Sequence, residues 1–269
     1  MLRMRHNIKI VSVCRLKRIY ASLLWLMPAL FVVPALHAQT VLSGFGTPVI
    51  DGQIRQDEWS EAASVKFDVK TPKSAGGRSV PGKFLVMNDA INLYLAIQFD
   101  AAEEGNSASF HFDEELRGYR APGDDLLLIN PSPLVGFLDS HISPEYYGIS
   151  DVDDGGEING EGSFSNEGGQ TSYEFSHPLD SGDYLHDFSL RPGKIIAFSM
   201  SIRLIDAETD LKWPDNGADT ELYPRGSTDG WGKIRILGQP TALRPGNDML
   251  LRARAALLKR CNRSPACSP

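Results

Sequence analysis

Apolar and polar residues alternate with a period of two in several stretches of this chain. Between Ile195 and Ile205 every second residue is apolar, and the same alternation covers Tyr173–Phe175 and Leu93–Phe99. Such alternation is typical of strands that bury one face in an antiparallel sheet. The sequence Arg-Pro-Gly-Lys at 191–194 favours a turn, because proline presets φ and glycine supplies positive φ. The pattern predicts an all-β protein.

The spacing of these stretches predicts which strands pair. Residues 83–87 and 91–99 read as a hairpin through the turn at Asn88–Asn92. The strands at 173–175 and 195–205 are expected to form a second, hairpin-like unit. With about 205 residues, 39–243 is long enough for one two-sheet antiparallel β-sandwich with a full core.

The first 38 residues have the composition of a targeting segment. A basic start is followed by an apolar run from Ala21 to Ala35 and then by Leu36-His37-Ala38, an order typical of secretory signal peptides. The apolar run is short for a membrane span, which needs roughly 20 residues. We expect cleavage near Ala38 and an extracytoplasmic protein, periplasmic or secreted; an uncleaved membrane anchor is the alternative.

Residues 244–269 differ from the body in composition. Met249–Lys259 can form a short basic, partly amphipathic helix that contacts a membrane surface, a partner or the acidic body, or it can be a frayed tail. Cys261 and Cys267 follow it, and in an oxidising compartment they can form a small disulfide loop or stay free.

The charge of the chain is acidic. The formal net charge is −7, and without the six basic residues of the first 38, residues 39–269 hold 21 basic and 34 acidic residues, a net charge of −13. Such a surface repels phosphate backbones and argues against nucleic-acid binding. It suits cation binding or solubility.

Five short motifs occur in an order that resembles a known family. They are IDGQIRQDEW, NLYLAIQFD, an acidic loop ending in DDLLLI, the stretch YEFSHPLDSGDYLHDFSLRPGKIIAFSMSIRL, and WGKIRI, which together span about residues 49–237. This order is similar to that of the family 9 carbohydrate-binding module-like domains, relatives of DOMON sandwiches. The resemblance implies a jelly-roll-like sandwich, usually without catalytic activity, that binds sugar in characterised members, binds haem in some relatives and carries structural calcium.

Aromatic side chains are the first candidates for sugar contacts, because their faces stack on the apolar side of a pyranose. Trp59 and Trp231 are expected in the core, since apolar residues flank both. The remaining tryptophan of the body lies in a loop-like sequence, and the loop aromatics complete the candidate ligand-binding set: Trp213, Tyr146, Tyr147 and Tyr223. The family's paired-tryptophan clamp has no evident second loop tryptophan here.

Clustered carboxylates are the candidate calcium ligands, because Ca²⁺ takes several oxygen ligands and glycine lets the backbone turn toward the ion. The spacing is not that of an EF-hand, and a solvated acidic turn is the alternative. The candidate metal ligands are Asp151, Asp153, Asp154, Glu157, Asp124 and Asp125.

Two further metal hypotheses stay open. The stretch His177–Asp187 combines two histidines with Asp180, Asp183 and Asp187, which can form a transition-metal site or a capped turn. Haem needs an axial histidine or methionine in an apolar pocket, and the candidates are His111, His141, Met87 and Met200.

Catalytic motifs do not support an enzyme. The chain has no GxSxG, no HExxH and no nucleophile with an evident base. The sequence predicts an extracytoplasmic, non-catalytic module that binds a saccharide, with structural calcium. A haem-binding redox module and a calcium-stabilised adhesion domain are the alternatives.

Overall fold

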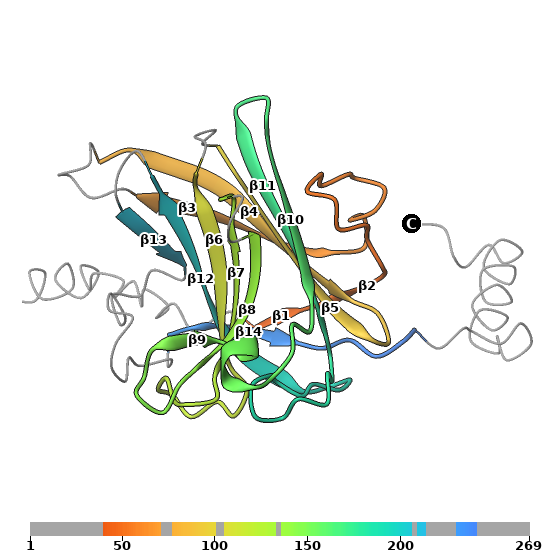
Figure 1. Cartoon of the computed structure of the whole chain (residues 1–269). Helices are drawn as coiled ribbons and strands as arrows, with labels where there is room; N and C mark the ends of the chain where they lie inside the picture. Colours follow the sequence, from red (N-terminus) through yellow and green to blue (C-terminus); the bar gives the residue numbers. More distant parts are fainter. Residues whose placement is uncertain are drawn as a thin grey trace, which may run out of the picture. The chain divides into compact units, whose positions relative to one another are not determined.

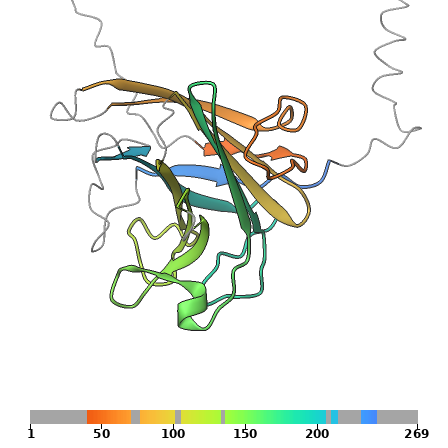
Figure 2. The same ribbon diagram turned by 45° about the horizontal axis from the view of Figure 1, so that its top comes forward.

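The computed structural model describes residues 40–70, 77–100, 105–132, 136–205, 209–213 and 230–240, and these form two β-sheets packed face to face (Figures 1 and 2). The predicted signal peptide, the predicted tail and Tyr223 lie outside the described residues. Within the described residues, no helix combines the length and the apolar character that a membrane span requires. The predicted all-β sandwich is confirmed.

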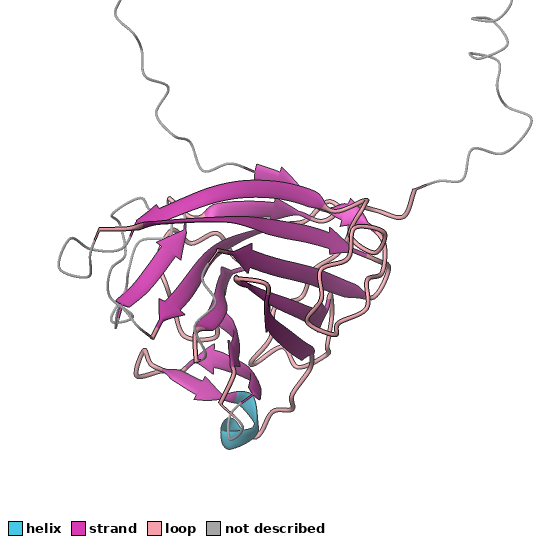
Figure 3. Ribbon diagram, turned by 90° about the horizontal axis from the view of Figure 1, so that it is seen from above, coloured by secondary structure: helices cyan, strands magenta, loops and turns pink. Residues whose placement is uncertain are grey.

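The first sheet contains the first and last strands of the described chain. Its order is β1 (Thr40–Leu42), β14 (Gly232–Arg235), β12 (Ile195–Leu204), β6 (Ser107–Asp113), β7 (Asp125–Asn130), β8 (Gly136–Ile142) and β9 (Gly148–Ser150), and β13 (Thr209–Trp213) also pairs with β12. A short 3₁₀ helix, η3 (Asp151–Asp154), follows β9 and is the cyan helix in Figure 3. The β1–β14 pair is parallel, and the other pairs of this sheet are antiparallel.

The second sheet confirms one predicted hairpin. Its order is β10 (Glu161–Glu167), β11 (Gln170–Pro178), β5 (Asn92–Phe99), β4 (Ser79–Asn88) and β2 (Gly44–Phe45), and β3 (Ala63–Lys70) also pairs with β4. Strands β4 and β5 are antiparallel neighbours with Asn88 opposite Leu93. The β2–β4 pair is parallel, so both sheets are mixed.

The other predicted hairpin is wrong. Strands β11 and β12 lie in different sheets, and the intervening residues 179–194, the crossover segment, pass from one sheet to the other. Both strands alternate because each turns one face toward the shared core, not because they hydrogen-bond to each other. Alternation reports a buried face and leaves the pairing partner open.

The core between the sheets is rich in aromatic rings. Phe110 of β6 meets Phe175 of β11 edge to face, with ring centroids 5.2 Å apart, and Phe84 of β4 lies 5.1 Å from Phe198 of β12. These four side chains are fully buried. Such contacts across the sheets, each aromatic pair contributing about 0.5–1.5 kcal/mol beyond area burial, hold the two layers together.

A second, smaller hydrophobic cluster covers the outer face of the second sheet. Trp59 packs there against Leu85, Met87 and Tyr94, which explains why β4 and β5 are buried on both faces. The indole N–H of Trp59 donates to Glu174 Oε1 at 2.8 Å. The predicted core positions of Trp59 and Trp231, 5% and 2% exposed, are confirmed.

Candidate functional site

A groove of about 730 Å³ lies at one end of the sandwich, between the two sheets. The first sheet contributes the start of β6, the end of β7 and the end of β12, and the second contributes the β10–β11 hairpin. Side chains that combine rings, amides and a guanidinium line it, among them Asn106, Asn130, Phe164, Asn166, Tyr173 and Arg203.

Two rings and one buried amide give the groove its chemistry. Phe164 is 40% exposed, and its ring stacks on that of Tyr173 with centroids 6.2 Å apart. The Tyr173 hydroxyl donates to the carbonyl of Asn106 at 2.5 Å. The Asn106 amide is buried and accepts a hydrogen bond from the Ile205 N–H, but its Nδ2 has no hydrogen-bond partner among the described residues. The groove therefore has an exposed aromatic face, and a buried amide lies beside it.

The opposite end of the sandwich holds a set of buried ionisable side chains, which we call the acidic centre. It consists of Asp125 on β7, Asp139 on β8, Asp151 on η3, His177 on β11 and Asp187 in the crossover segment. His177 Nε2 lies 3.6 Å from Asp187 Oδ2 and 3.8 Å from Asp139 Oδ2. All five side chains are buried.

The carboxylates of the acidic centre are under-satisfied. Five of their oxygens have no hydrogen-bond partner in the described part of the chain: Asp125 Oδ1, Asp139 Oδ1, Asp151 Oδ2 and both of Asp187. Buried polar atoms normally find partners, because leaving one unpaired costs about 1–3 kcal/mol. Four carboxylates against one imidazole leave an excess of negative charge that calls for cations or protons.

The pKa values show the same imbalance. Burial raises the pKa of Asp139 to about 6 and that of Asp151 to about 7, and burial also raises the pKa of Asp125 well above its ordinary value. Burial alone would lower the pKa of His177, but Asp187, Asp125 and Asp139 outweigh it and raise it to about 9. The acidic centre therefore favours protonation of its side chains or the binding of a cation.

The predicted metal ligands separate into four sets in the structure. Asp125 and Asp151 belong to the acidic centre, and Asp154 lies beside His141 and His186. Asp124 instead pairs with the Arg117 guanidinium and accepts the Ala121 N–H. Asp153 and Glu157 are exposed and belong to none of the described metal-binding groups.

Sequence reasoning did not select Asp139 as a ligand. It lies within the strand sequence GFLDSHI and is fully buried. A carboxylate within a predicted strand, directly after Phe137 and Leu138, is the feature that could have identified it, because a buried charge needs a partner. In the stretch His177–Asp187, His177 and Asp187 belong to the acidic centre, and His186 lies with His141 and Asp154. Asp180 pairs with Ser189 in an isolated backbone β-bridge.

The predicted sugar-contacting aromatics lie away from the groove lining. Trp213 is on strand β13 rather than in a loop, and its half-buried ring packs near Phe84 and Phe198, with centroids 6.3 and 5.7 Å away. Tyr146 and Tyr147 follow β8, at the end that holds the acidic centre; Tyr147 is 47% exposed.

The haem-ligand candidates are dispersed. Met87 belongs to the outer hydrophobic cluster and Met200 to the main core. His111 is buried on β6, where burial holds its pKa well below the ordinary value, and His141 lies beside His186. The described residues bring no two of these four candidates together as an axial pair.

Comparison with known proteins identifies solved structures that share the fold of this chain. No family model and no curated protein matches the chain. Among solved structures, a family 9 carbohydrate-binding module from Caldicellulosiruptor kristjanssonii in complex with cellotriose is similar, with 16% identity, a TM-score of 0.52 and coverage of 78% of this chain and 100% of that one. The same module in complex with glucose gives 16% identity, a TM-score of 0.51 and coverage of 77% and 100%.

A third structure, of a protein from Bacteroides uniformis ATCC 8492, is 10% identical, with a TM-score of 0.52 and coverage of 74% of this chain and 99% of that one. All three identities are low, so the likeness concerns the fold. The relation to DOMON sandwiches stays a prediction. The chain therefore has the two-sheet fold of the family 9 carbohydrate-binding modules, as the order of its sequence motifs implies.

Proposed function

We propose that this protein is an extracytoplasmic, non-catalytic carbohydrate-binding module and that the groove between the sheets takes the saccharide. The fold supports this, because modules of the same fold were solved with glucose and cellotriose. The observation that carries the proposal is the exposed Phe164 face beside the amides of Asn106, Asn130 and Asn166.

The groove's side chains suit the chemistry of a sugar. A pyranose presents a face of C–H bonds that stacks on an aromatic ring, while its hydroxyls need donors and acceptors. Phe164 supplies the ring, and the amides of Asn130 and Asn166 in the groove lining supply hydrogen-bonding groups for the hydroxyls. Arg203, at the end of β12, adds a planar set of donors on the opposite wall. Trp213, Tyr146 and Tyr147 have no part in this site.

Calorimetric titration with glucose and cellotriose tests the proposal. We expect the Phe164→Ala variant to lose at least about tenfold in affinity, which corresponds to about 1.4 kcal/mol. The matched control is Tyr147→Ala, which removes an exposed ring at the opposite end and should leave affinity unchanged. If neither sugar binds, the proposed function is wrong; if only Tyr147→Ala weakens binding, the groove is the wrong site.

We also propose that the acidic centre holds a structural Ca²⁺. Calcium takes six to eight oxygens at about 2.3–2.6 Å from carboxylates, carbonyls and water. The centre fits this preference, because it gathers four carboxylates from four chain segments with five unpartnered oxygens. The ion would tie β7, β8, η3 and the crossover segment together.

Thermal unfolding in EGTA and in calcium tests this second proposal. Ca²⁺ at 100 times its Kd adds about 2.7 kcal/mol, or about 5–10 °C in Tm for a domain of this size. Asp187→Asn should abolish the rise, because Asp187 belongs to both described groups of the acidic centre. Asp153→Asn is the matched control and should keep it. An equal rise in both variants would place calcium elsewhere.

A further inference from the structure

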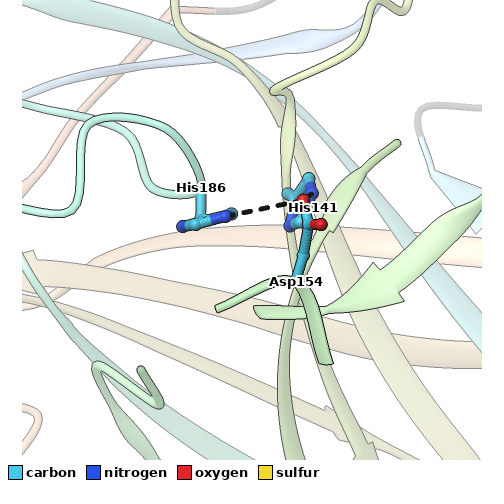
Figure 4. Close-up of side chains that lie close together, drawn as sticks. All are labelled: His141, Asp154 and His186. Atoms are coloured by element: carbon cyan, nitrogen blue, oxygen red, sulfur yellow. Dashed lines mark ion pairs between the residues drawn. The ribbon is translucent and has the colours of Figure 1, made fainter. Parts of the chain in front are cut away.

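We propose that His141, Asp154 and His186 form a second metal site, for a divalent transition-metal ion such as Zn²⁺. Figure 4 shows the three side chains close together. They come from three separate segments, which are the end of β8, the end of η3 and the crossover segment. One ligand atom of each lies within 4.8 Å of the others.

The distances suit a small tetrahedral ion. Asp154 Oδ2 lies 3.2 Å from His141 Nε2 and 3.7 Å from His186 Nε2. Ligands that sit about 2.0–2.1 Å from a tetrahedral zinc are about 3.3–3.4 Å apart. Asp154 is 51% exposed, so a water molecule can take a fourth position. Two imidazoles and one carboxylate are a ligand set that suits zinc and its neighbours better than calcium.

The other nitrogen of each imidazole is held by a second carboxylate. His141 Nδ1 lies 2.7 Å from Asp151 Oδ1, and His186 Nδ1 lies 2.7 Å from Asp183 Oδ1. Histidines that bind metals typically donate their remaining N–H to a carboxylate or carbonyl, which fixes the tautomer and points the free lone pair at the ion. Both histidines have this arrangement.

Protonation of the two histidines alone leaves unfavourable contacts between His141, His186 and Asp154. An imidazole that donates through Nδ1 turns the lone pair of Nε2 toward the Asp154 carboxylate, unless the ring is doubly protonated. The two rings lie 4.6 Å apart, so two imidazolium ions repel each other. One divalent cation removes both repulsions.

The backbone beside the site leaves no room for a side chain. A Cβ at Gly156 would lie 2.6 Å from Asp183 Oδ2 and from His186 Nδ1. Gly156 also donates its N–H to the Asp151 carbonyl at 2.7 Å, which holds the turn against the site. Residues 151–156 therefore close tightly over the His186 loop, and only glycine permits that approach.

This site is distinct from the acidic centre but connected to it. Asp151 turns Oδ1 toward His141 and keeps Oδ2 unpartnered toward the carboxylates. An ion held by His141, Asp154 and His186 would clasp the crossover segment to η3 and β8, which fixes the link between the two sheets. The inference does not depend on saccharide binding.

Cobalt and zinc titrations of the purified, untagged protein test the inference. Cys14, Cys261 and Cys267 are replaced by serine so that no thiol of the full chain competes for metal. We expect one Zn²⁺ per chain in calcium-containing buffer, and visible d–d bands of tetrahedral Co²⁺ that Zn²⁺ displaces. Asp154→Asn and His186→Gln should each weaken binding at least about 100-fold, and the positioning variant Asp183→Asn about 10–100-fold.

Asp153→Asn is the matched control, because Asp153 lies on the same 3₁₀ helix, is exposed and belongs to no described metal-binding group. It should bind Zn²⁺ as the parent does. Unchanged Zn²⁺ affinity in Asp154→Asn, or no saturable binding by the parent, would overturn the inference. Asp154 is half-exposed, so its substitution tests the site even if His186→Gln fails to fold.

Discussion

Glu174 shows how one buried carboxylate organises its surroundings. It lies on the outer face of β11, fully buried, and burial raises its pKa. Oε1 accepts the Trp59 indole N–H, and Oε2 accepts the backbone N–H of Gly52 at 2.7 Å and of Asp51 at 3.1 Å. Residues 51–59, which include Trp59 on the outer face of the second sheet, are therefore held to the Glu174 carboxylate by three hydrogen bonds.

Replacing Glu174 by glutamine should destabilise the protein by about 2–3 kcal/mol. The glutamine amide turns two N–H donors toward groups that are themselves donors, so at least one donor loses its acceptor. Urea unfolding measures the effect, with Glu161→Gln on β10 as the exposed control. Equal midpoints for the two variants would contradict this role of Glu174.

The acidic centre shows what sequence can predict at the scale of residues. Asp151 and Asp125 are recognisable as calcium candidates because each lies in a dense acidic stretch. Asp139 and Asp187 join them only because β8 and the crossover segment meet at one end of the fold. Spacing along the chain cannot predict contacts between segments that are far apart in sequence.

The same limit applies at the scale of strands. Alternation correctly predicts strands in the regions of β11 and β12, and the short β4–β5 connection correctly predicts a hairpin. It does not predict that β11 is buried on both faces. Nor does it predict that β11 and β12 lie in different sheets. A sixteen-residue crossover, 179–194, removes the local constraint that a tight turn places on pairing.

Tyr173 joins the two sheets at the groove, so its hydroxyl should affect both stability and ligand affinity. Tyr173→Phe removes the hydrogen bond to the Asn106 carbonyl and should cost about 1–2 kcal/mol of unfolding free energy. Cellotriose affinity should fall as well, because Asn106 lines the groove. Urea unfolding measures the loss of stability, and calorimetry measures the loss of affinity.

Tyr184→Phe is the control for Tyr173→Phe, because the Tyr184 side chain is 70% exposed. Equal unfolding free energies and equal cellotriose affinities of the two variants would contradict this role of the Tyr173 hydroxyl.

At the scale of the whole molecule, the fold separates two kinds of chemistry. Strands β6, β7 and β12 are neighbours in the first sheet (Figure 1). The groove lies at one end of these strands and the ionisable residues lie at the other. Chelation of metal should therefore lower stability without removing the groove. We expect cellotriose affinity in EDTA to stay within about twofold of its value in calcium, at temperatures well below Tm. Complete loss of binding would show that the two ends depend on each other.

Stability should depend on pH in the absence of metal. The folded pKa values of Asp139 (about 6) and Asp151 (about 7) exceed the unfolded value, so the folded state binds more protons between about pH 4 and 7 and loses stability as pH rises. His177, with a raised pKa of about 9, extends the loss above pH 7. We expect Tm in EDTA to fall by about 4–8 °C from pH 5 to pH 8.

Calcium should remove most of that fall, because the ion neutralises the carboxylates in place of protons. Thermal scans at several pH values, with EDTA or with Ca²⁺, measure both curves. A Tm in EDTA that rises from pH 5 to pH 8 would contradict the charge balance of the acidic centre.

The central claim is that the groove binds a saccharide, and amide chemical-shift mapping of isotope-labelled protein during a cellotriose titration tests it most directly. We predict saturable shifts for the backbone of β10 around Phe164 and for the side-chain amides of Asn106, Asn130 and Asn166, with no shifts around Tyr147 and Tyr184. Shifts confined to the acidic end would contradict the site, and an unchanged spectrum at millimolar sugar would contradict the function.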